Sequence, residues 1–339
     1  MKSINIYTVN YPSFEKPIRR AIKYINDEYG INIKLYFLDN RNVTKYSHVD
    51  IAIFYGDIEV HAIEKIDADY VIAFTDTPLL PNPSSYGIDI KRQGKWVIYG
   101  SSKYVTSLYK SNDYYKDMIQ DEVVYKPMWI HHDSEEVKSI VNVAKNTRYS
   151  DRQYDYMFLM TNSLRKGSEY IEPILNEADR SNADLRFLVI APYDVIYKIK
   201  MKKYRHIKVD TAESKVIPDD KLIQYYLNSK TILFPSKGEG IGYPPIESNE
   251  LGCSAITTKG LAMNEFREGE IPIQYVGTER YTIIPERYFI YYYPSVEKMI
   301  STVLNRYHPN PEYIADKFGM TNKVFANKLF DILNEYVKI

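Results

Sequence analysis

Short, almost uninterrupted runs of apolar residues constrain the fold of this chain more than any other feature. Asp50 to Tyr55 (DIAIFY) and Asp69 to Phe74 (DYVIAF) are the clearest of them. A strand that is apolar at nearly every position is covered on both faces, which is typical of parallel sheets. The helical pattern from Phe14 to Tyr29, which ends at Gly30, supplies one such cover. The sequence therefore predicts an α/β fold in which parallel strands are joined by right-handed crossovers.

The residues that follow the predicted strands are candidates for ligand binding, because parallel sheets bind ligands at the carboxyl ends of their strands. Asn10 follows the first strand, and Asp76 follows the run that ends at Phe74. Asp76 can hydrogen-bond a ligand or cap the loop before Pro78, and both interpretations stay open. Further strands are expected at Ile4 to Val9, Ile31 to Leu38, Lys95 to Tyr99 and Val123 to Trp129.

The strand and helix pattern begins again after a polar stretch near Asn142, which we interpret as a linker. A length of 339 residues exceeds one usual core, so two domains are expected. We place the N-terminal domain at residues 1–145, the C-terminal domain at residues 146–320 and a final helix at residues 321–339.

Composition narrows the class of protein. The 45% hydrophobic and 26% charged residues are typical of a globular protein. Because 44 basic residues balance 44 acidic ones, no nucleic-acid groove is indicated. A single cysteine, Cys253, excludes an internal disulfide, and neither a signal peptide nor an apolar run of membrane-spanning length is seen. We expect a cytoplasmic protein, with peripheral membrane contact left open. The 34 tyrosines, with abundant Lys and Ile, favour a thermophilic source.

The most informative motif runs from Phe234 to Thr258, FPSKGEGIGYPPIESNELGCSAITT. Glycines spaced two apart follow an apolar strand, two prolines suit the first turn of a helix, and Gly252 ends that helix. Glu239 and Glu247 bracket the bend. A helix N-terminus can hold a phosphate, and a carboxylate accepts hydrogen bonds from vicinal hydroxyls, so a sugar nucleotide suits both. The alternative is a turn with one solvated glutamate and one that interacts with the helix dipole.

This run resembles the signature of the family-four retaining glycosyltransferases, usually P-S-x-x-E-G-F-G-x-P-x-x-E followed by a turn and a strand. The resemblance implies two Rossmann-like domains that face each other across a cleft, the GT-B arrangement, with the final helix crossing back to the first domain. It also implies that Glu247 holds ribose hydroxyls. Glu239 and the backbone of Gly240, Ile241 and Gly242 would hold the donor sugar.

The segment TNSLRKGSEY resembles the family's first loop of the second domain. The resemblance places Lys166, and Arg165 beside it, against the donor diphosphate, where fixed cations stabilise developing charge. An isolated Arg-Lys pair at a helix start is otherwise usually solvated. Ile217 matches a position that packs on the nucleobase, and a core role for it is equally open.

Two departures from the family pattern are clear. The family usually has Gly-Arg shortly before the R-K-G triplet, where this chain has Met160-Thr161-Asn162. It also commonly has a histidine after the strand that ends at Phe74, where this chain has Thr75-Asp76-Thr77. Asp76 is the candidate to take over that histidine's contact, and the acceptor is expected near Asn10 and Asp76.

The resemblance predicts transfer of a sugar from a nucleotide-diphosphate sugar to an unidentified glycan, lipid or protein acceptor, with retention at the anomeric carbon. The catalytic candidates are Glu239, Lys166 and Asp76. We expect no metal and no other cofactor, since His131 and His132 have no third histidine nearby. The alternatives are a degenerate GT-B protein that binds a sugar nucleotide or glycan without turnover, or another two-domain enzyme such as an epimerase or phosphorylase.

Overall fold

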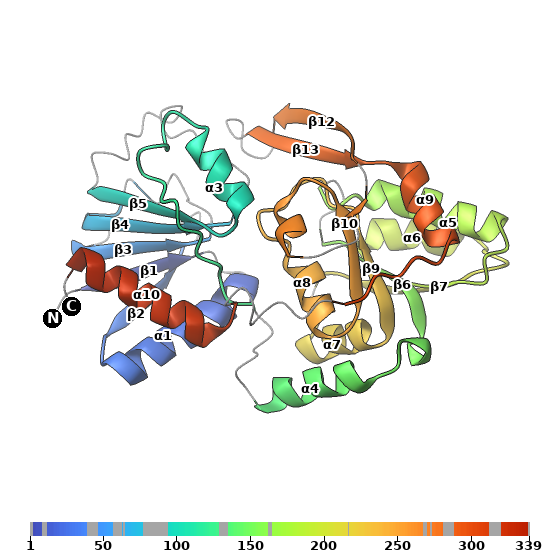
Figure 1. Ribbon diagram of the computed structural model, residues 1–339, viewed down its shortest axis with the longest axis horizontal. Helices are drawn as coiled ribbons and strands as arrows, with labels where there is room; N and C mark the ends of the chain where they lie inside the picture. Colours follow the sequence, from blue (N-terminus) through green and yellow to red (C-terminus); the bar gives the residue numbers. More distant parts are fainter. Residues whose placement is uncertain are drawn as a thin grey trace. The chain divides into compact units, whose positions relative to one another are not determined.

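The computed structural model shows two α/β units (Figure 1). It describes residues 3–8, 12–38, 47–56, 63, 65–76, 94–128, 135–161, 165–215, 217–266, 270–271, 273–280, 288–311 and 320–337. The first unit comprises Met1–Glu135, Glu279–Phe289 and Ala315–Ile339, and the second comprises Glu136–Thr278 and Ile290–Ile314.

The first unit contains a five-stranded parallel sheet in the order β2-β1-β3-β4-β5. All of its described strand pairs are parallel, as the sequence predicts. The strands are β1 (Ile4–Thr8), β2 (Ile33–Phe37), β3 (Val49–Tyr55), β4 (Ala68–Thr75) and β5 (Lys95–Gly100). The helices are α1 (Pro12–Tyr29), α3 (Lys103–Lys110) and α10 (Asn322–Val337).

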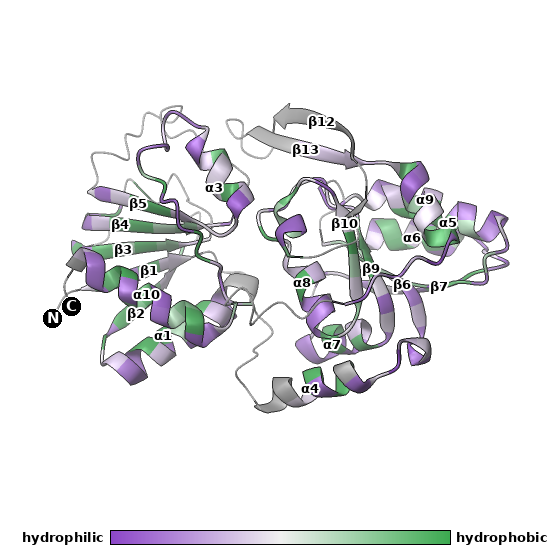
Figure 2. Cartoon of the chain, viewed as in Figure 1, coloured by the Kyte–Doolittle hydropathy of each residue, from purple (hydrophilic) through white to green (hydrophobic). Residues whose placement is uncertain are grey.

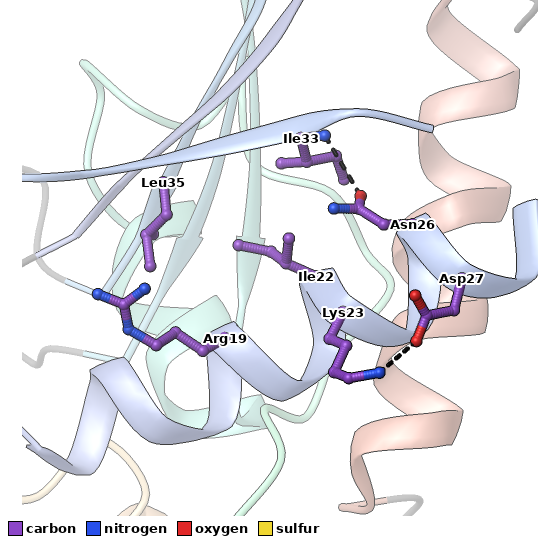
Figure 3. Close-up of a pocket in the computed structure, with 7 residues that line it drawn as sticks. All are labelled: Arg19, Ile22, Lys23, Asn26, Asp27, Ile33 and Leu35. Atoms are coloured by element: carbon purple, nitrogen blue, oxygen red, sulfur yellow. Dashed lines mark hydrogen bonds and ion pairs between the residues drawn. The ribbon is translucent and has the colours of Figure 1, made fainter. Parts of the chain in front are cut away.

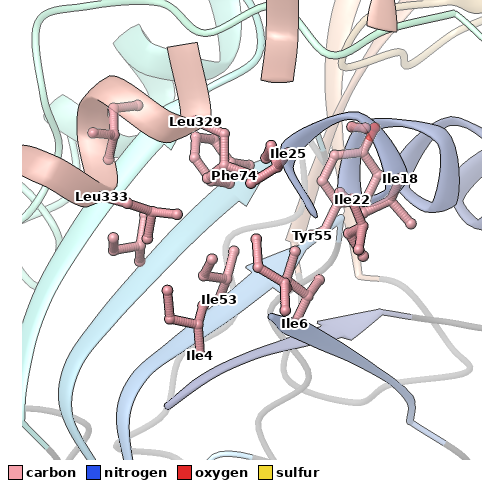
Figure 4. Close-up of a cluster of buried hydrophobic side chains, with 14 of the residues drawn as sticks. Ile4, Ile6, Ile18, Ile22, Ile25, Ile53, Tyr55, Phe74, Leu329 and Leu333 are labelled. Atoms are coloured by element: carbon pink, nitrogen blue, oxygen red, sulfur yellow. The ribbon is translucent and has the colours of Figure 1, made fainter. Parts of the chain in front are cut away.

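Alternate residues of these strands enter two separate cores, one on each face of the sheet. Ile53 belongs to the core beneath α1 and α10, whereas its neighbour Phe54 belongs to the core beneath α3. Figure 4 shows Leu329 and Leu333 of α10 among the side chains of the first core. The C-terminal helix therefore completes the core of the first unit, and Tyr29 Oη donates to Asn327 Oδ1 at 2.9 Å between α1 and α10.

The second unit contains a six-stranded parallel sheet in the order β11-β10-β9-β6-β7-β8. The strands are β6 (Tyr154–Leu159), β7 (Arg186–Ala191), β8 (Lys208–Glu213), β9 (Ser229–Phe234), β10 (Ser254–Thr258) and β11 (Glu270–Ile271). Its helices are α4 (Glu135–Asn146), α5 (Ile171–Arg180), α6 (Tyr193–Met201), α7 (Asp219–Leu227), α8 (Tyr243–Glu250) and α9 (Val296–Leu304). Strands β12 (Ile273–Arg280) and β13 (Tyr288–Pro294) form a separate two-stranded sheet.

Hydropathy follows this layering. In Figure 2 the central strands of both sheets are largely hydrophobic, and hydrophilic residues lie on the helices and connections. One core of the second unit joins α5 and α9 to the sheet through side chains such as Ile174, Leu233 and Met299. Each unit therefore has a hydrophobic core of its own.

The polar stretch near Asn142 is not a linker, which corrects our interpretation. It forms α4, whose Ala144 is 2% exposed, and continues to the buried Arg152. The Arg152 guanidinium donates to the carbonyls of Tyr226, Ser229 and Leu251 at 2.8–3.0 Å. Arg152 therefore holds the ends of α7, β9 and α8 together. The second unit begins at Glu136, before the expected boundary at residue 146.

The strand expected from Val123 to Trp129 is also corrected over its described part, residues 123–128. This segment has no regular strand pairing. Val124 N–H donates to Gly100 O at 3.0 Å, and Met128 N–H donates to Met320 O at 3.1 Å. Its apolar side chains are buried because the segment lies between the end of β5 and the residues that lead into α10.

Candidate functional site

Two loops of the second unit lie side by side where the neighbouring parallel strands β6 and β9 end. Lys237 N–H in the loop after β9 donates to Arg165 O in the loop after β6 at 2.9 Å. Gly167 has a φ of +77°, and a Cβ there would lie 2.4 Å from Pro235 O. A side chain at residue 167 would therefore force the two loops apart.

The glycine loop leads directly into α8, as the sequence predicts. Gly242 precedes the helix with a φ of +78°, and Pro244 and Pro245 lie in its first turn. A Cβ on Gly242 would lie 2.4 Å from Met263 Cγ, so the close packing of the loop also requires glycine. Ile241 is 2% exposed, and the loop backbone is buried throughout residues 235–242.

The predicted diphosphate-binding cations and the predicted sugar-binding glutamate form one cluster. Arg165 Nη1 donates to Glu239 Oε1 at 2.8 Å, Ser236 Oγ donates to the same oxygen at 2.6 Å, and Lys166 Nζ also donates to it. Lys166 Nζ lies 4.8 Å from the centroid of the Phe234 ring. Three donors thus converge on one carboxylate oxygen, and among the described residues no donor bonds the other oxygen of Glu239.

The charges of this cluster are set by burial and by one another. Burial opposes ionisation of Glu239, but Arg165 and Lys166 outweigh it and lower the pKa of the carboxyl to about 2. Burial and the charge of Arg165 lower the pKa of the Lys166 ammonium to about 8, against the opposing effect of Glu239. An ammonium has three donors, and one of those of Lys166 goes to Glu239. The remaining donors suit a phosphate oxygen at neutral pH.

Glu247 lies on α8 in an environment of its own. Its side chain is 1% exposed, and Tyr226 Oη donates to Oε2 at 3.4 Å. Oε1 has no hydrogen-bond partner within the described part of the chain. Burial raises the pKa of Glu247 well above its usual range, and the charge of Asp219 adds to that effect, whereas the Tyr226 bond opposes it. A buried carboxylate oxygen without a donor is costly, and a ligand hydroxyl would satisfy it.

Ile217 is half-buried and lies two residues before α7, so the structure leaves its predicted nucleobase contact open. Gly240 and Ile241 lie in the same loop as Glu239. The structure therefore brings together Arg165, Lys166 and Glu239, and places Glu247 on the helix that follows their loop.

The predicted acceptor residues belong to the first unit. Asn10 lies outside the described residues. Asp76 follows β4, and its Oδ2 lies 2.7 Å from Nζ of Lys126. The Lys126 side chain is fully buried, that of Asp76 is 10% exposed, and the ammonium lies 4.5 Å from the centroid of the Tyr55 ring. Asp76 is thus one half of a buried ion pair, whatever ligand contact it makes.

Sequence reasoning assigned no role to three residues that shape these sites. Ser236 could have been found, because it holds a fixed place in the P-S-x-x-E pattern. Tyr226 lies 21 positions before its partner Glu247 on another helix, and Lys126 lies 50 positions after Asp76. Those two pairs depend on tertiary packing and leave no local signal.

A surface pocket between α1 and β2 does not contain any of the predicted site residues (Figure 3). Its polar groups bond within the protein. Lys23 pairs with Asp27, Arg19 Nε pairs with Glu15 Oε1 at 2.7 Å, and Asn26 Oδ1 accepts from Ile33 N at 3.3 Å. We assign no ligand to this pocket.

The described residues contain no group of three or more His, Cys, Asp or Glu side chains placed to hold a metal ion. His131 and His132 lie outside the described residues. Across the same part of the chain, no helix is both long enough and apolar enough to cross a membrane.

Solved structures with the same fold include several glycosyltransferases. A glycosyltransferase from Rickettsia africae matches with a TM-score of 0.57 and 14% identity, over 100% of both chains. Alr3699/HepE from Anabaena, in complex with UDP and glucose, matches with a TM-score of 0.60 and 9% identity, over 98% of this chain and 100% of that one. The lipopolysaccharide outer core galactosyltransferase WaaB matches with a TM-score of 0.57 and 13% identity, over 98% and 100%. No protein-family model and no curated protein matches the sequence.

The two parallel sheets with their helices define an α/β protein built from two Rossmann-like units. These structural neighbours are glycosyltransferases of the GT-B type, so the predicted GT-B fold class is confirmed.

Proposed function

We propose that this protein transfers a sugar from a nucleoside diphosphate sugar to an acceptor hydroxyl, with retention at the anomeric carbon and without a metal. The observation that carries the proposal is Glu247, a buried carboxylate whose Oε1 lacks a donor among the described residues. It lies on the helix that leaves the glycine loop, in the order of the glycosyltransferase signature. A ribose hydroxyl supplies the missing donor.

The cation cluster supports the diphosphate part of the proposal. Lys166 and Arg165 lie at the carboxyl edge of the sheet, and both already bond the Glu239 carboxylate. In the reaction, the bond between the anomeric carbon and the β-phosphate oxygen breaks as the acceptor oxygen bonds that carbon on the same face. The acceptor proton passes to an oxygen of the leaving phosphate. The two cations stabilise the charge that develops on that phosphate, and Glu239 positions sugar hydroxyls.

The acceptor is proposed to bind the first unit, near Asp76 and Asn10. Asp76 forms an ion pair with Lys126, which orients its carboxylate beside the end of β4. A carboxylate in that position accepts a hydrogen bond from an acceptor hydroxyl. Its chemistry does not distinguish a glycan, lipid or protein acceptor.

A donor screen tests the proposal. We would measure thermal unfolding and nucleotide release for the full chain with UDP-, GDP- and ADP-sugars, each with and without EDTA. UDP-sugars come first, because two of the structural neighbours hold UDP with a sugar. We expect one donor to raise the melting temperature and to be turned over slowly, with EDTA having no effect. The anomeric configuration of the product, measured by NMR, tests retention.

Two variants assign the release to this site. Lys166→Met is expected to slow nucleotide release at least about tenfold, the effect of losing about 1.4 kcal/mol of transition-state stabilisation. Lys298→Met, an exposed lysine on α9, serves as the matched control and should release nucleotide at the parental rate. Equal release by both variants would contradict the assignment, and loss of release in EDTA would contradict metal independence.

The second candidate is a GT-B protein that binds a sugar nucleotide or glycan without turnover. It is favoured by the end of β6, where buried Met160 and exposed Thr161 stand in place of the family's Gly-Arg. In the donor screen this protein would be stabilised by a sugar nucleotide but would release no nucleotide with any acceptor. Release of free nucleotide together with an altered sugar, without an acceptor, would instead indicate an epimerase.

A further inference from the structure

Helix α6 carries a stripe of exposed large apolar side chains on its outer face. Tyr193 is 67% exposed, Tyr197 is 54% exposed and Met201 is 68% exposed. They are spaced four apart, so they follow one side of the helix. Within the described part of the chain, only three other large apolar side chains are exposed, and they lie on separate elements: Val143, Tyr307 and Val324. Among the residues that the structure describes, the stripe is therefore the one place where such side chains gather.

The inner face of α6 fixes the direction of this stripe. Ile196 and Ile199 are each 4% exposed and belong to the core that covers the sheet of the second unit. The ring centroids of Tyr193 and Tyr197 lie 6.3 Å apart, so the two rings lie next to each other along the helix. The outer face is consequently a preformed surface that requires no unfolding to become accessible.

Basic residues border the stripe. Residues 193–205 contain five of them (Lys198, Lys200, Lys202, Lys203 and Arg205) and one acidic residue, Asp194, for a net charge of +4. The whole chain has 44 basic and 44 acidic residues, so this short segment departs from a neutral background. Lys202 bonds Glu172, and the other four basic side chains are exposed. By helical spacing, Lys198 and Lys200 lie on opposite sides of the stripe.

We propose that this outer face of α6 docks the protein on an anionic lipid bilayer. Tyrosine rings favour the headgroup region, and methionine adds apolar area that reaches below it. Lysine and arginine attract anionic lipids, each contributing about 1 kcal/mol near the surface. A protein partner fits less well, because lysine is depleted at the cores of protein interfaces. The inference does not rest on the proposed sugar transfer, since lipid binding requires no nucleotide.

The test is sedimentation of the full chain with vesicles at low and moderate salt. Vesicles of phosphatidylcholine with about 30% phosphatidylglycerol have a negative surface. They therefore supply the charge that the proposal requires. We expect binding to these vesicles, at least about tenfold weaker binding to pure phosphatidylcholine, and release of the protein as salt rises. Equal binding to both vesicles, or no binding to either, would overturn the proposal.

Two triple variants locate the surface. Tyr193→Ser/Tyr197→Ser/Met201→Ser removes the stripe, and we expect it to bind at least about tenfold more weakly, the equivalent of 1.4 kcal/mol. Val143→Ser/Tyr307→Ser/Val324→Ser removes the same number of exposed apolar side chains elsewhere and should bind like the parent. We expect the parent and both variants to have the same melting temperature, because the substituted side chains are exposed. A difference in vesicle binding would then not result from unfolding. Undiminished binding by the stripe variant would overturn the proposal.

Two further measurements follow. One separates the charged contribution to vesicle binding from the apolar one, and the other tests for a protein partner. Lys198→Gln/Lys200→Gln/Lys203→Gln should reduce the salt dependence of vesicle binding without abolishing the apolar contribution. Light scattering of the parent and the stripe variant tests whether the stripe joins two copies of the chain. A dimer that dissociates on loss of the stripe would identify a protein interface and would overturn the membrane proposal.

Discussion

Burial of the Glu247 carboxyl lowers the stability of the folded protein, and the same carboxyl is proposed to bind the donor. Burial raises the pKa of its carboxyl well above the usual range, so this group ionises more easily in the unfolded chain than in the folded one. We therefore expect Glu247→Gln, which cannot ionise, to stabilise the protein at pH 7, by about 1.4 kcal/mol for each unit by which the folded pKa exceeds the unfolded one up to that pH. The same variant should lose donor binding.

The pH dependence of that gain supplies its check. Because the folded pKa lies above the unfolded one, the penalty is absent below the unfolded pKa and grows as pH rises above it. The gain from Glu247→Gln, measured by urea unfolding, should thus vanish near pH 4 and be present at pH 7. Glu177→Gln is the control of opposite sign, since Arg180 lowers the pKa of Glu177 and the substitution removes a favourable pair. A destabilised Glu247→Gln protein at pH 7 would contradict this account.

Lys166 predicts a pH dependence of diphosphate binding. Burial and Arg165 lower its pKa to about 8, so the ammonium that bonds phosphate is lost as pH rises above that value. The affinity for UDP, measured by titration calorimetry, should be flat from pH 6.5 to 7.5 and should then fall up to about tenfold per pH unit. The diphosphate is mostly in its fully ionised form in that range, because its last pKa is about 6 as in other phosphates.

Two comparisons isolate the lysine. Uridine has no phosphate, so its affinity should not change up to about pH 9, above which its base ionises. Lys166→Arg keeps a cation that stays protonated, and its UDP affinity should remain flat to about pH 9. A parental affinity that is unchanged between pH 7 and pH 9 would show that Lys166 does not carry the phosphate contact.

The ion pair between Asp76 and Lys126 predicts that removing one charge destabilises the protein more than removing both. Asp76→Asn removes the anion that lies 2.7 Å from a fully buried ammonium, and we expect a loss of up to about 3–5 kcal/mol in the free energy of unfolding. Lys126→Met/Asp76→Leu removes both charges and should recover most of that loss. Lys116→Met breaks an exposed pair with Asp113, which solvent screens, so we expect little change in stability. If Asp76→Asn alone is harmless, the pair is not structural, and any loss of activity reports on the acceptor site directly.

At the scale of elements, the entry into α8 depends on one backbone conformation. Gly242 has a φ of +78°, and an added Cβ would meet Met263, so Gly242→Ala imposes both backbone strain and a contact that must shift. We expect a loss of about 1–2 kcal/mol from the backbone alone, with more from the contact, together with weaker donor binding as the loop moves.

Gly30 provides the matched control for that prediction. Its φ is +67°, but nothing lies within 4 Å of an added Cβ. Gly30→Ala should therefore cost only the backbone strain and should leave donor binding unchanged, because Gly30 ends α1 in the first unit. Equal destabilisation of the two variants in thermal unfolding would show that the contact with Met263 relaxes freely.

The elements were predictable from the sequence to different extents. Strands such as β3 and β4 are apolar at nearly every position, so their pattern and their parallel arrangement were predicted correctly. The glycine loop and the helix that starts at its prolines were also predicted correctly. Glycine marks positions with a positive φ, and proline marks the first turn of a helix, so both can be recognised from the sequence. Segment 123–128 was wrongly predicted as a strand, because burial beside the residues leading into α10 produces the same apolar pattern as strand pairing.

The residues of the candidate site were also predictable from the sequence to different extents. Arg165, Lys166 and Glu239 meet because two loops at neighbouring strand ends carry them, and family resemblance was enough to select them. The partners Tyr226 and Lys126 could not be selected, because each is one polar residue among many and only tertiary packing places it. The structural role of Arg152 could not be predicted from the sequence for a related reason. Its buried guanidinium bonds backbone carbonyls from three elements, whereas its sequence context is that of a polar linker.

At the scale of the whole molecule, each unit has its own core, and the proposed donor site belongs entirely to the second. We therefore expect calorimetric unfolding in two transitions. A donor nucleotide at about 100 times its Kd should stabilise only the second unit, by about 2.7 kcal/mol. For a domain of that size, this corresponds to a rise of about 5–10 °C in one melting temperature.

Variants of each unit assign the two transitions. Glu247→Gln should raise the transition that the nucleotide raises, and should then abolish the nucleotide's effect, because the same carboxylate causes the instability and is proposed to contact the ribose. Asp76→Asn should lower the other transition and leave the nucleotide's effect intact, since its partner Lys126 is buried in the first unit. A single transition that responds to every variant would mean that the units unfold together. Their stabilities would then be coupled, and burying the ribose-binding carboxylate would cost stability to the whole chain rather than to the unit that contains it.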